Sequence, residues 1–277
     1  TLAPPRTFQS LASNTPSTFL TAAPLGRRRR DFGSARASTI SCPQCLTAAS
    51  ICFDIARAAL ELYDYAEQQA EQRRQCPGHD LISALLAPTI DGECLTDLQY
   101  KNLFVLMISA GNDTSRYTMA AGLRALAERP ETFQELRQAC IDRDDDVVDR
   151  AVEEVLRWSS VTMHFRRTAT QDVELGGKLI KQGDKVLTWF ASADYDERQF
   201  ADPFTFDIHR WPNDHVAFNL RSPHLCLGAQ LARMEIKLLF QELLPLLKSV
   251  QLAGPVERLR SNFICGMKRL PVQVSWA

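Results

Sequence analysis

The hydrophobic period of the chain changes from helical to strand-like after Trp158, and this change limits the folds that the chain can adopt. Before it, apolar residues such as Ile55 and Ala59 recur at spacings that place them on one face of a helix. After it, alternation and Gly-containing turns predict short strands at Thr168–Leu175, Lys178–Ile180 and Lys185–Phe190. We therefore expect an α+β fold that is predominantly α-helical, with a small antiparallel sheet.

Start and stop signals give the bounds of the expected helices. A helix that begins near Ile51 should end at Cys76-Pro77-Gly78, and Asp80 is placed to cap the short helix that follows. Thr96 and Asp97 should open a long apolar helix. The expected helices span residues 51–75, 81–86, 97–127, 130–140, 147–158 and 230–249. An irregular stretch, Asp194–Pro223, holds most of the prolines and aromatic residues of the second half.

The first 50 residues differ in composition from the rest of the chain. They are rich in Ser, Thr, Pro and Ala and contain the basic run Arg27–Arg30. We expect residues 1–50 to form a flexible or atypical N-terminal segment and residues 51–277 to form one domain. Targeting, or binding to an anionic surface, is an alternative role for the basic run.

The charge balance and the cysteine spacing argue against several function classes. The chain has 32 Lys and Arg against 33 Asp and Glu, which gives no electrostatic reason to expect nucleic acid or a membrane surface as a partner. The 8 cysteines are too sparse for a disulfide framework, so we expect reduced thiols and a cytoplasmic location. Cys42 and Cys45 have zinc-site spacing without a second pair, so a zinc-binding interaction protein is a minor alternative.

The segment His224-Leu225-Cys226-Leu227-Gly228 directly precedes a long amphipathic helix. Backbone N–H groups and the helix dipole at such a position favour a thiolate on Cys226. Gly228 leaves room for a flat ligand to approach the first turn. The residues alone allow Cys226 to be a nucleophile, a zinc ligand, an axial haem ligand or a buried structural cysteine.

Two further segments place polar groups inside helices. Ala110–Thr114 puts Gly, Asp and Thr into the long apolar helix, where Gly costs roughly 1 kcal/mol relative to Ala. These residues favour a local backbone distortion, either as an opening for a pocket or as a packing kink. Glu154 and Arg157, three positions apart, share a helix face and can pair.

These three segments, taken together, resemble the signature of the cytochromes P450. Glu154-x-x-Arg157, the Ala110–Thr114 segment and the loop that ends in Cys226-x-Gly228 occur in the order and spacing of that family. The resemblance covers about Leu60 to Trp276. It implies a cytochrome P450 fold with a shortened N-terminal part, and haem b as the cofactor.

The resemblance also implies roles for single residues. Cys226 matches the thiolate that ligates the haem iron, and Phe218 and Gly228 match neighbouring haem-binding positions. Thr114 and Asp113 match the pair that delivers protons to bound dioxygen, and Gly111 matches the position that leaves space for it. The remaining matches are Arg166 and His224 as donors to the haem propionates, Glu154, Arg157 and Arg210 as a structural triad, and Val161, Met163, Phe263 and Ile264 as substrate-facing residues.

A finer resemblance concerns the substrate class. Phe165–Thr170, His215–Phe218 and Arg258–Phe263 look like the bacterial subgroup that oxidises steroid side chains, terpenoids and methyl-branched lipids. This resemblance implies a monooxygenase that inserts one oxygen atom from dioxygen into an apolar lipid. Its electrons would come from a ferredoxin- or flavodoxin-type donor with its reductase. The alternative is a non-catalytic or haem-deficient fragment of the same fold.

Two departures from the family pattern favour that alternative. The loop before Cys226 is normally rich in glycine, whereas here residues 219–223 contain none. We expect Leu220 and Arg221 to be strained there, at roughly 1–2 kcal/mol for each misplaced residue. Residues 1–50 also do not resemble the N-terminal part of the family. From these departures the sequence predicts that this chain binds less than one equivalent of haem.

Overall fold

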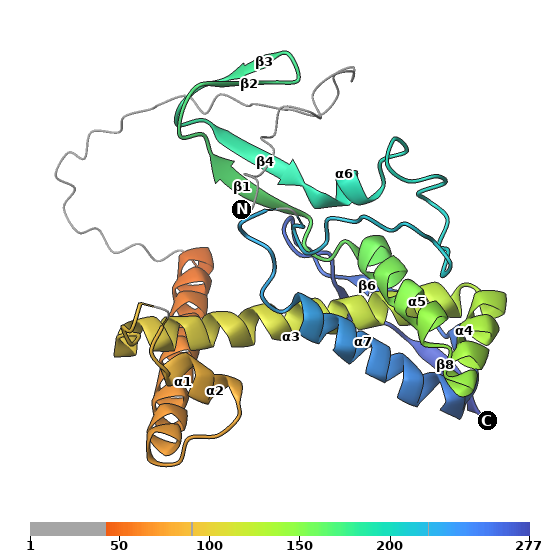
Figure 1. The fold of residues 1–277 in the computed structure, drawn as a ribbon, viewed down its shortest axis with the longest axis horizontal. Helices are drawn as coiled ribbons and strands as arrows, with labels where there is room; N and C mark the ends of the chain where they lie inside the picture. The colour runs from red at the N-terminus through yellow and green to blue at the C-terminus, as the bar shows by residue number, and fades with distance from the viewer. Residues whose placement is uncertain (1–42, 90, 221) are drawn as a thin grey trace, which may run out of the picture. The chain divides into compact units, whose positions relative to one another are not determined.

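The computed structural model describes residues 43–89, 91–220 and 222–277, with side chains from residue 54 onward. The described chain divides into two compact units, and the division falls between Asp113 and Thr114, inside a long helix (Figure 1). Cys42 and the basic run Arg27–Arg30 lie outside the described residues, and so does the side chain of Cys45.

The first unit consists of helices whose small core lies against the long helix. Tyr100 is almost fully buried there with Ala66, and its hydroxyl donates a hydrogen bond to the Ala66 carbonyl at 3.1 Å. Asp80 caps the short helix as expected, because its side chain accepts from the backbone N–H of Ser83 at 2.8 Å. The helices of this unit are α1 (Pro43–Gln75), α2 (Leu81–Leu86) and the first part of α3 (Asp97–Ala127).

Helix α1 begins earlier than its hydrophobic pattern indicated. Its backbone is helical from Pro43, so the boundary that we drew between residues 50 and 51 lies inside it. Its end at Gln75 agrees with the stop signal Cys76-Pro77-Gly78, since Pro77 cannot continue a helix. The assignment of residues 51–277 to one haem-binding domain stays a prediction.

The second unit is built around three helices that approach closely at Gly122. A Cβ atom at this buried position of α3 would lie 3.0 Å from side-chain atoms of both Val155 and Phe240. The absence of a side chain therefore brings three helices together in the main core. The helices that follow α3 are α4 (Pro130–Asp142), α5 (Asp145–Ser159), the short α6 (Phe190–Asp194) and α7 (Ala229–Leu243).

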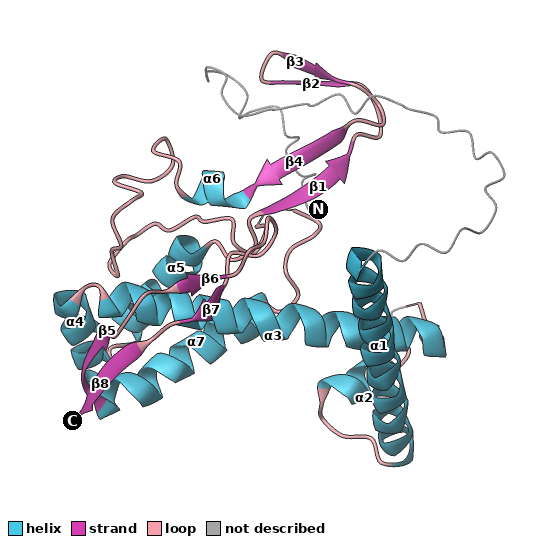
Figure 2. Cartoon of the chain, turned by 180° about the vertical axis from the view of Figure 1, so that it is seen from behind, coloured by secondary structure: helices cyan, strands magenta, loops and turns pink. Residues whose placement is uncertain are grey.

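The strands form four separate two-stranded antiparallel ladders within the described residues, where we expected one small sheet (Figure 2). The predicted strand Thr168–Leu175 is wrong, because the chain bends at residues 170–171 and Thr168 and Val173 belong to two different ladders. Phe190 opens α6 and does not end a strand. The pairs are β1 (His164–Thr168) with β4 (Lys185–Trp189), β2 (Val173–Leu175) with β3 (Lys178–Ile180), β5 (Leu247–Leu252) with β8 (Val272–Trp276), and β6 (Glu257–Arg258) with β7 (Met267–Arg269).

The last helix is shorter than predicted. We expected it to reach Ser249, but α7 ends at Leu243 and a short 3-10 helix, η2 (Leu244–Leu246), leads into β5. Pro245 explains the difference, since it has no N–H for the helical hydrogen bond and its ring clashes with the preceding turn. The apolar residues that followed helical spacing here instead pack a strand against the core.

Helix α3 runs through the polar segment without interruption. All 31 residues from Asp97 to Ala127 are α-helical, so the local distortion that we expected at Ala110–Thr114 does not break the helix. A Cβ atom at Gly111 would meet no other atom within 4 Å. Among the described residues, no helix combines the length and the hydropathy that crossing a membrane requires.

The two glycines of α3 should respond oppositely to substitution. Gly122→Val should destabilise the protein by about 1–3 kcal/mol, because the new side chain collides with Val155 and Phe240. Gly111→Ala should be neutral or should stabilise by up to about 1 kcal/mol, because it adds helix propensity in open space. Urea unfolding followed by circular dichroism measures both changes. Equal effects of the two substitutions would contradict the packing described at Gly122.

Candidate functional site

Cys226 lies on the turn that enters α7, and its thiol is exposed. Its backbone N–H donates a hydrogen bond to the carbonyl of Phe218 at 3.0 Å, and its carbonyl accepts from the N–H of Ala229 at 3.2 Å. Gly228 is the N-cap residue of the helix. The thiol therefore lies at the N-terminal end of α7, where the helix dipole has its positive end.

The loop before Cys226 is held by polar side chains in place of glycines. Asn219 adopts a left-handed backbone, with φ of 58°, which Asn tolerates better than most residues do. Its side-chain amide donates to the Ser222 hydroxyl at 3.2 Å and to the His224 carbonyl at 3.1 Å. Leu220 has a negative φ, so the strain that we predicted for it is wrong. The strain predicted for Arg221 lies outside the described residues.

The surface around the thiol is open and apolar. Leu225 is 52% exposed and Leu227 is 84% exposed. A Cβ atom at Gly228 would meet only the Cys226 sulfur, 4.0 Å away. Exposed leucines beside a thiol, with no side chain over the first turn, fit a flat apolar ligand that the sulfur would bind through a metal. The residues present here are thus compatible with haem b.

The polar residues of α3 fall on both sides of the unit boundary. Gly111 and Asp113 belong to the first unit, whereas Thr114 belongs to the unit that contains Cys226. Thr114 is partly buried, and its carbonyl accepts a hydrogen bond from the Thr118 hydroxyl at 2.9 Å. The role of Gly111 beside bound dioxygen stays a prediction.

Glu154 is the centre of a buried polar cluster. Its carboxylate accepts two hydrogen bonds from Arg157, at 2.7 and 2.8 Å, and both side chains are fully buried. Arg210 donates to the same carboxylate at 3.1 Å, so the three residues of the predicted triad lie in contact. Sequence reasoning missed two more donors, the Asn213 side-chain amide at 3.1 Å and the Asp207 N–H at 3.0 Å.

The cluster joins α5 to the irregular stretch. Arg157 donates to the carbonyls of Asp194 and Pro203, at 2.8 and 2.9 Å. The Arg210 guanidinium donates to the Ala201 carbonyl at 2.7 Å. These bonds fix a segment that has few regular backbone hydrogen bonds of its own, and that segment leads to the Cys226 loop.

Glu153, the neighbour of Glu154, belongs to a second polar cluster that the sequence did not reveal. It accepts hydrogen bonds from the Nε2 of His215 at 2.9 Å and from the Nη2 of Arg233 at 3.0 Å. Burial opposes ionisation, but these hydrogen bonds outweigh it and lower the pKa of Glu153 to about 2. The adjacent pair Glu153-Glu154 in the sequence was the available signal, and it carried no information about the partners.

Asp194, at the end of α6, is a buried acid that bonds to two other segments. The Asp194 side chain accepts from the Ser160 hydroxyl at 2.7 Å and from the Val216 N–H at 2.8 Å. Burial nevertheless raises the pKa of Asp194 above its ordinary value, despite both hydrogen bonds. Asp194 thereby connects the end of α5 to the segment just before Phe218.

The residues predicted to face the substrate come together from two segments. Met163 donates its N–H to the Phe263 carbonyl at 2.9 Å, and Thr162 forms a β-bridge with Ile264. Val161 is buried, whereas Phe263 is 41% exposed. The two segments therefore run side by side, with Val161 turned into the core and Phe263 exposed.

The two predicted propionate donors are exposed, which suits side chains that meet a charged ligand edge. Arg166 lies in β1, opposite Leu187 of β4, and His224 lies in the Cys226 loop. Among the described residues, no group of three or more His, Cys, Asp or Glu side chains could hold a metal ion by itself. The zinc site proposed at Cys42 and Cys45 lies outside the described side chains.

Comparisons with known proteins point to one family. A family model described as "Cytochrome P450" matches residues 48–249. The methyl-branched lipid omega-hydroxylase of Mycobacterium tuberculosis is 43% identical over 208 residues, which cover 75% of this chain and 48% of that protein. The steroid C26-monooxygenase of Mycolicibacterium smegmatis is 37% identical over 224 residues, covering 81% of this chain and 51% of that protein.

A solved structure has a similar fold. The crystal structure of CYP109E1 from Bacillus megaterium in complex with testosterone matches with a TM-score of 0.76 and 32% sequence identity. The match covers 83% of this chain and 63% of that chain. The chain spans about half the length of the curated relatives that it matches.

Removing the carboxylate at the centre of the first cluster should strongly destabilise the protein. Glu154→Ala leaves Arg157 buried without its counter-charge, a loss of about 3–5 kcal/mol. Glu128→Ala is the control, because it removes partly exposed ion pairs with Arg124 and Arg129 that contribute at most about 1 kcal/mol each. Urea unfolding compares the two variants. A Glu154→Ala protein as stable as Glu128→Ala would contradict a structural role for the buried cluster.

Proposed function

The chain belongs to the cytochrome P450 family, and on this premise we propose that it is the haem-binding part of a monooxygenase in which Cys226 ligates the iron. The observation that carries the proposal is the exposed Cys226 thiol, held before α7 by the Phe218 carbonyl beside open space at Gly228. Proteins of this family bind haem b through a cysteine thiolate, which supplies electron density for activating dioxygen.

The chain's own residues would then divide the work of binding and proton delivery. Arg166 and His224 would donate hydrogen bonds to the haem propionates, where cationic donors suit carboxylates. Gly111 would leave space for dioxygen. The Thr114 hydroxyl would hold a proton that Asp113 resupplies through water, which is general acid work.

We propose an apolar lipid as the substrate class: a steroid side chain, a terpenoid or a methyl-branched lipid. Phe263, Ile264, Met163 and Val161 would contact it with apolar side chains. The activities named for two relatives, a methyl-branched lipid omega-hydroxylase and a steroid C26-monooxygenase, support this class. The electron donor would be a ferredoxin- or flavodoxin-type protein with its reductase. A fragment that binds haem poorly is the competing possibility, and the first experiment below decides between them.

Replacing the proposed ligand should remove the thiolate signature. Cys226→Ser should abolish the red-shifted Soret band of the reduced carbon monoxide complex, because a neutral hydroxyl does not donate as a thiolate does. Cys265→Ser, which changes another free cysteine of the same unit, should leave the band in place. A band that survives in Cys226→Ser assigns the ligand to another residue. A wild-type chain without the band identifies a haem-deficient fragment.

Substitution of Thr114 should separate proton delivery from substrate binding. Thr114→Ala should keep the haem content and the substrate-induced spectral shift, while product per reducing equivalent falls several-fold, within the roughly 100-fold that a general acid commonly contributes. Thr114→Ser restores a hydroxyl at the same position and should restore coupling. Unchanged coupling in Thr114→Ala would restrict Thr114 to helix packing.

A further inference from the structure

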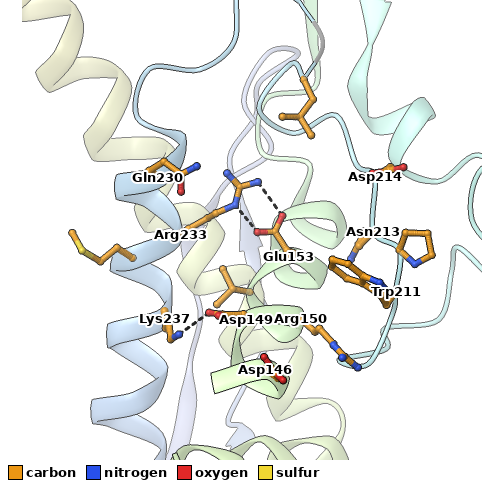
Figure 3. Close-up of a pocket in the computed structure, with 14 residues that line it drawn as sticks. Asp146, Asp149, Arg150, Glu153, Trp211, Asn213, Asp214, Gln230, Arg233 and Lys237 are labelled. Atoms are coloured by element: carbon orange, nitrogen blue, oxygen red, sulfur yellow. Dashed lines mark hydrogen bonds and ion pairs between the residues drawn. The ribbon is translucent and has the colours of Figure 1, made fainter. Parts of the chain in front are cut away.

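The second polar cluster, which consists of Glu153, His215 and Arg233, joins α5, the irregular stretch and α7. We call it the Glu153 cluster. Glu153 accepts from Nη2 of Arg233 at 3.0 Å and also from its Nε, so the contact is bidentate (Figure 3). The His215 side chain is fully buried and contacts the same carboxylate at 2.9 Å. One carboxylate thus fixes two side chains from different segments.

The hydrogen bonds of His215 define its tautomer. Its Nδ1 accepts the backbone N–H of Ala217 at 3.3 Å, so the ring proton lies on Nε2 and is donated to Glu153. The Glu153 carboxylate and the Arg233 guanidinium form the ion pair of the cluster. The ring also holds the backbone of Ala217, the residue just before Phe218.

Two members of the cluster, Arg233 and His215, contact the ring of Phe218. The Arg233 guanidinium lies 4.7 Å from the centroid of the Phe218 ring, a cation–π contact. The centroid of the His215 ring lies 6.2 Å from the same ring. Phe218 is buried, and its carbonyl receives the N–H of Cys226 at 3.0 Å. A continuous chain of contacts therefore runs from Glu153 to the backbone of the cysteine.

We propose that Glu153, His215 and Arg233 are positioning residues for Cys226, because they fix the Phe218 carbonyl that holds the Cys226 amide. The buried cluster of Glu154, Arg157 and Arg210 anchors the irregular stretch at residues 194–213, whereas the Glu153 cluster anchors the part that precedes the cysteine. The role of Cys226 as a haem ligand rests on the proposed function. The positioning of the Cys226 backbone does not.

The chain offers a matched control on the same two helices. Lys237 pairs with Asp149 at 2.8 Å and with Asp145 at 3.1 Å (Figure 3 shows the Asp149 pair). Asp149 and Lys237 lie one helical turn from Glu153 and Arg233, respectively. Both ion pairs join α5 to α7 and both line the same cavity of about 760 Å³. Only the Glu153 pair includes a residue that contacts Phe218.

Amide hydrogen exchange tests the positioning without requiring haem. In the full chain, Glu153→Gln and Arg233→Gln should each accelerate exchange of the peptide that contains the Cys226 N–H by about tenfold or more. Asp149→Asn should change it by less than about twofold. Equal acceleration in Asp149→Asn, or no acceleration in the first two variants, would overturn the proposal.

A second pair of variants serves if Glu153→Gln does not fold. His215→Gln keeps an N–H where Nε2 donates to Glu153, whereas His215→Leu keeps the bulk without the donor. The proposal expects exchange near the wild-type rate in His215→Gln and about tenfold faster exchange in His215→Leu. The same rate in both variants would show that filling the space is sufficient, and would overturn it.

The haem-loaded protein supplies a second, spectroscopic signature. The Glu153 cluster variants should lose part of the red-shifted carbon monoxide band, because the thiolate is no longer held in one position, and Asp149→Asn should retain it. A wild-type chain without that band would contradict the proposed function, and the exchange experiment would still decide the positioning role. A full band in Glu153→Gln with accelerated exchange would overturn the link between the loop and the thiolate.

Discussion

The buried pair of Glu154 and Arg157 is the interaction on which the second unit depends. Removing both charges from water is costly, and the cost is offset because Arg157, Arg210 and Asn213 all donate hydrogen bonds to the Glu154 carboxylate. The same bonds replace the backbone ladder that the irregular stretch lacks. The position of the Cys226 loop thus depends on an electrostatic network, and the residues of that stretch that enter the hydrophobic core, such as Phe218, add packing to it.

Adjacent residues on α5 direct their carboxylates into different networks. Glu154 is fully buried among arginines, whereas Glu153 is partly exposed at the edge of a cavity, with one histidine and one arginine as partners. The first network is closed to water and sets where the chain can run. The second contacts the ring of Phe218, and the backbone carbonyl of Phe218 accepts the hydrogen bond from the Cys226 N–H. Neighbouring residues of one helix therefore have different tasks: Glu154 fixes the path of the irregular stretch, and Glu153 acts on the residues next to the cysteine.

The sequence predicted best where local chemistry decides the structure. The C-terminal end of α1 follows from Pro77, and the starts of α2 and α3 follow from Asp80 and the residues around Asp97. The predominantly helical α+β class is confirmed. It failed where distant partners decide. Alternation could not separate β1 from β2, and Leu220 was expected to take the strain that Asn219 takes. The roles of Asp113, Thr114 and Arg166 follow from the family resemblance and stay predictions.

The glycine-free loop before Cys226 also affects the unfolded chain. A glycine-rich loop samples many backbone conformations when unfolded, and fixing them on folding costs more entropy than for other residues. Asn219 reaches the left-handed conformation with a side chain that then makes two hydrogen bonds, so less freedom is lost for a loop of the same shape. The absence of glycine from this loop, which suggests strain in the folded state, therefore also restricts the backbone of the unfolded chain.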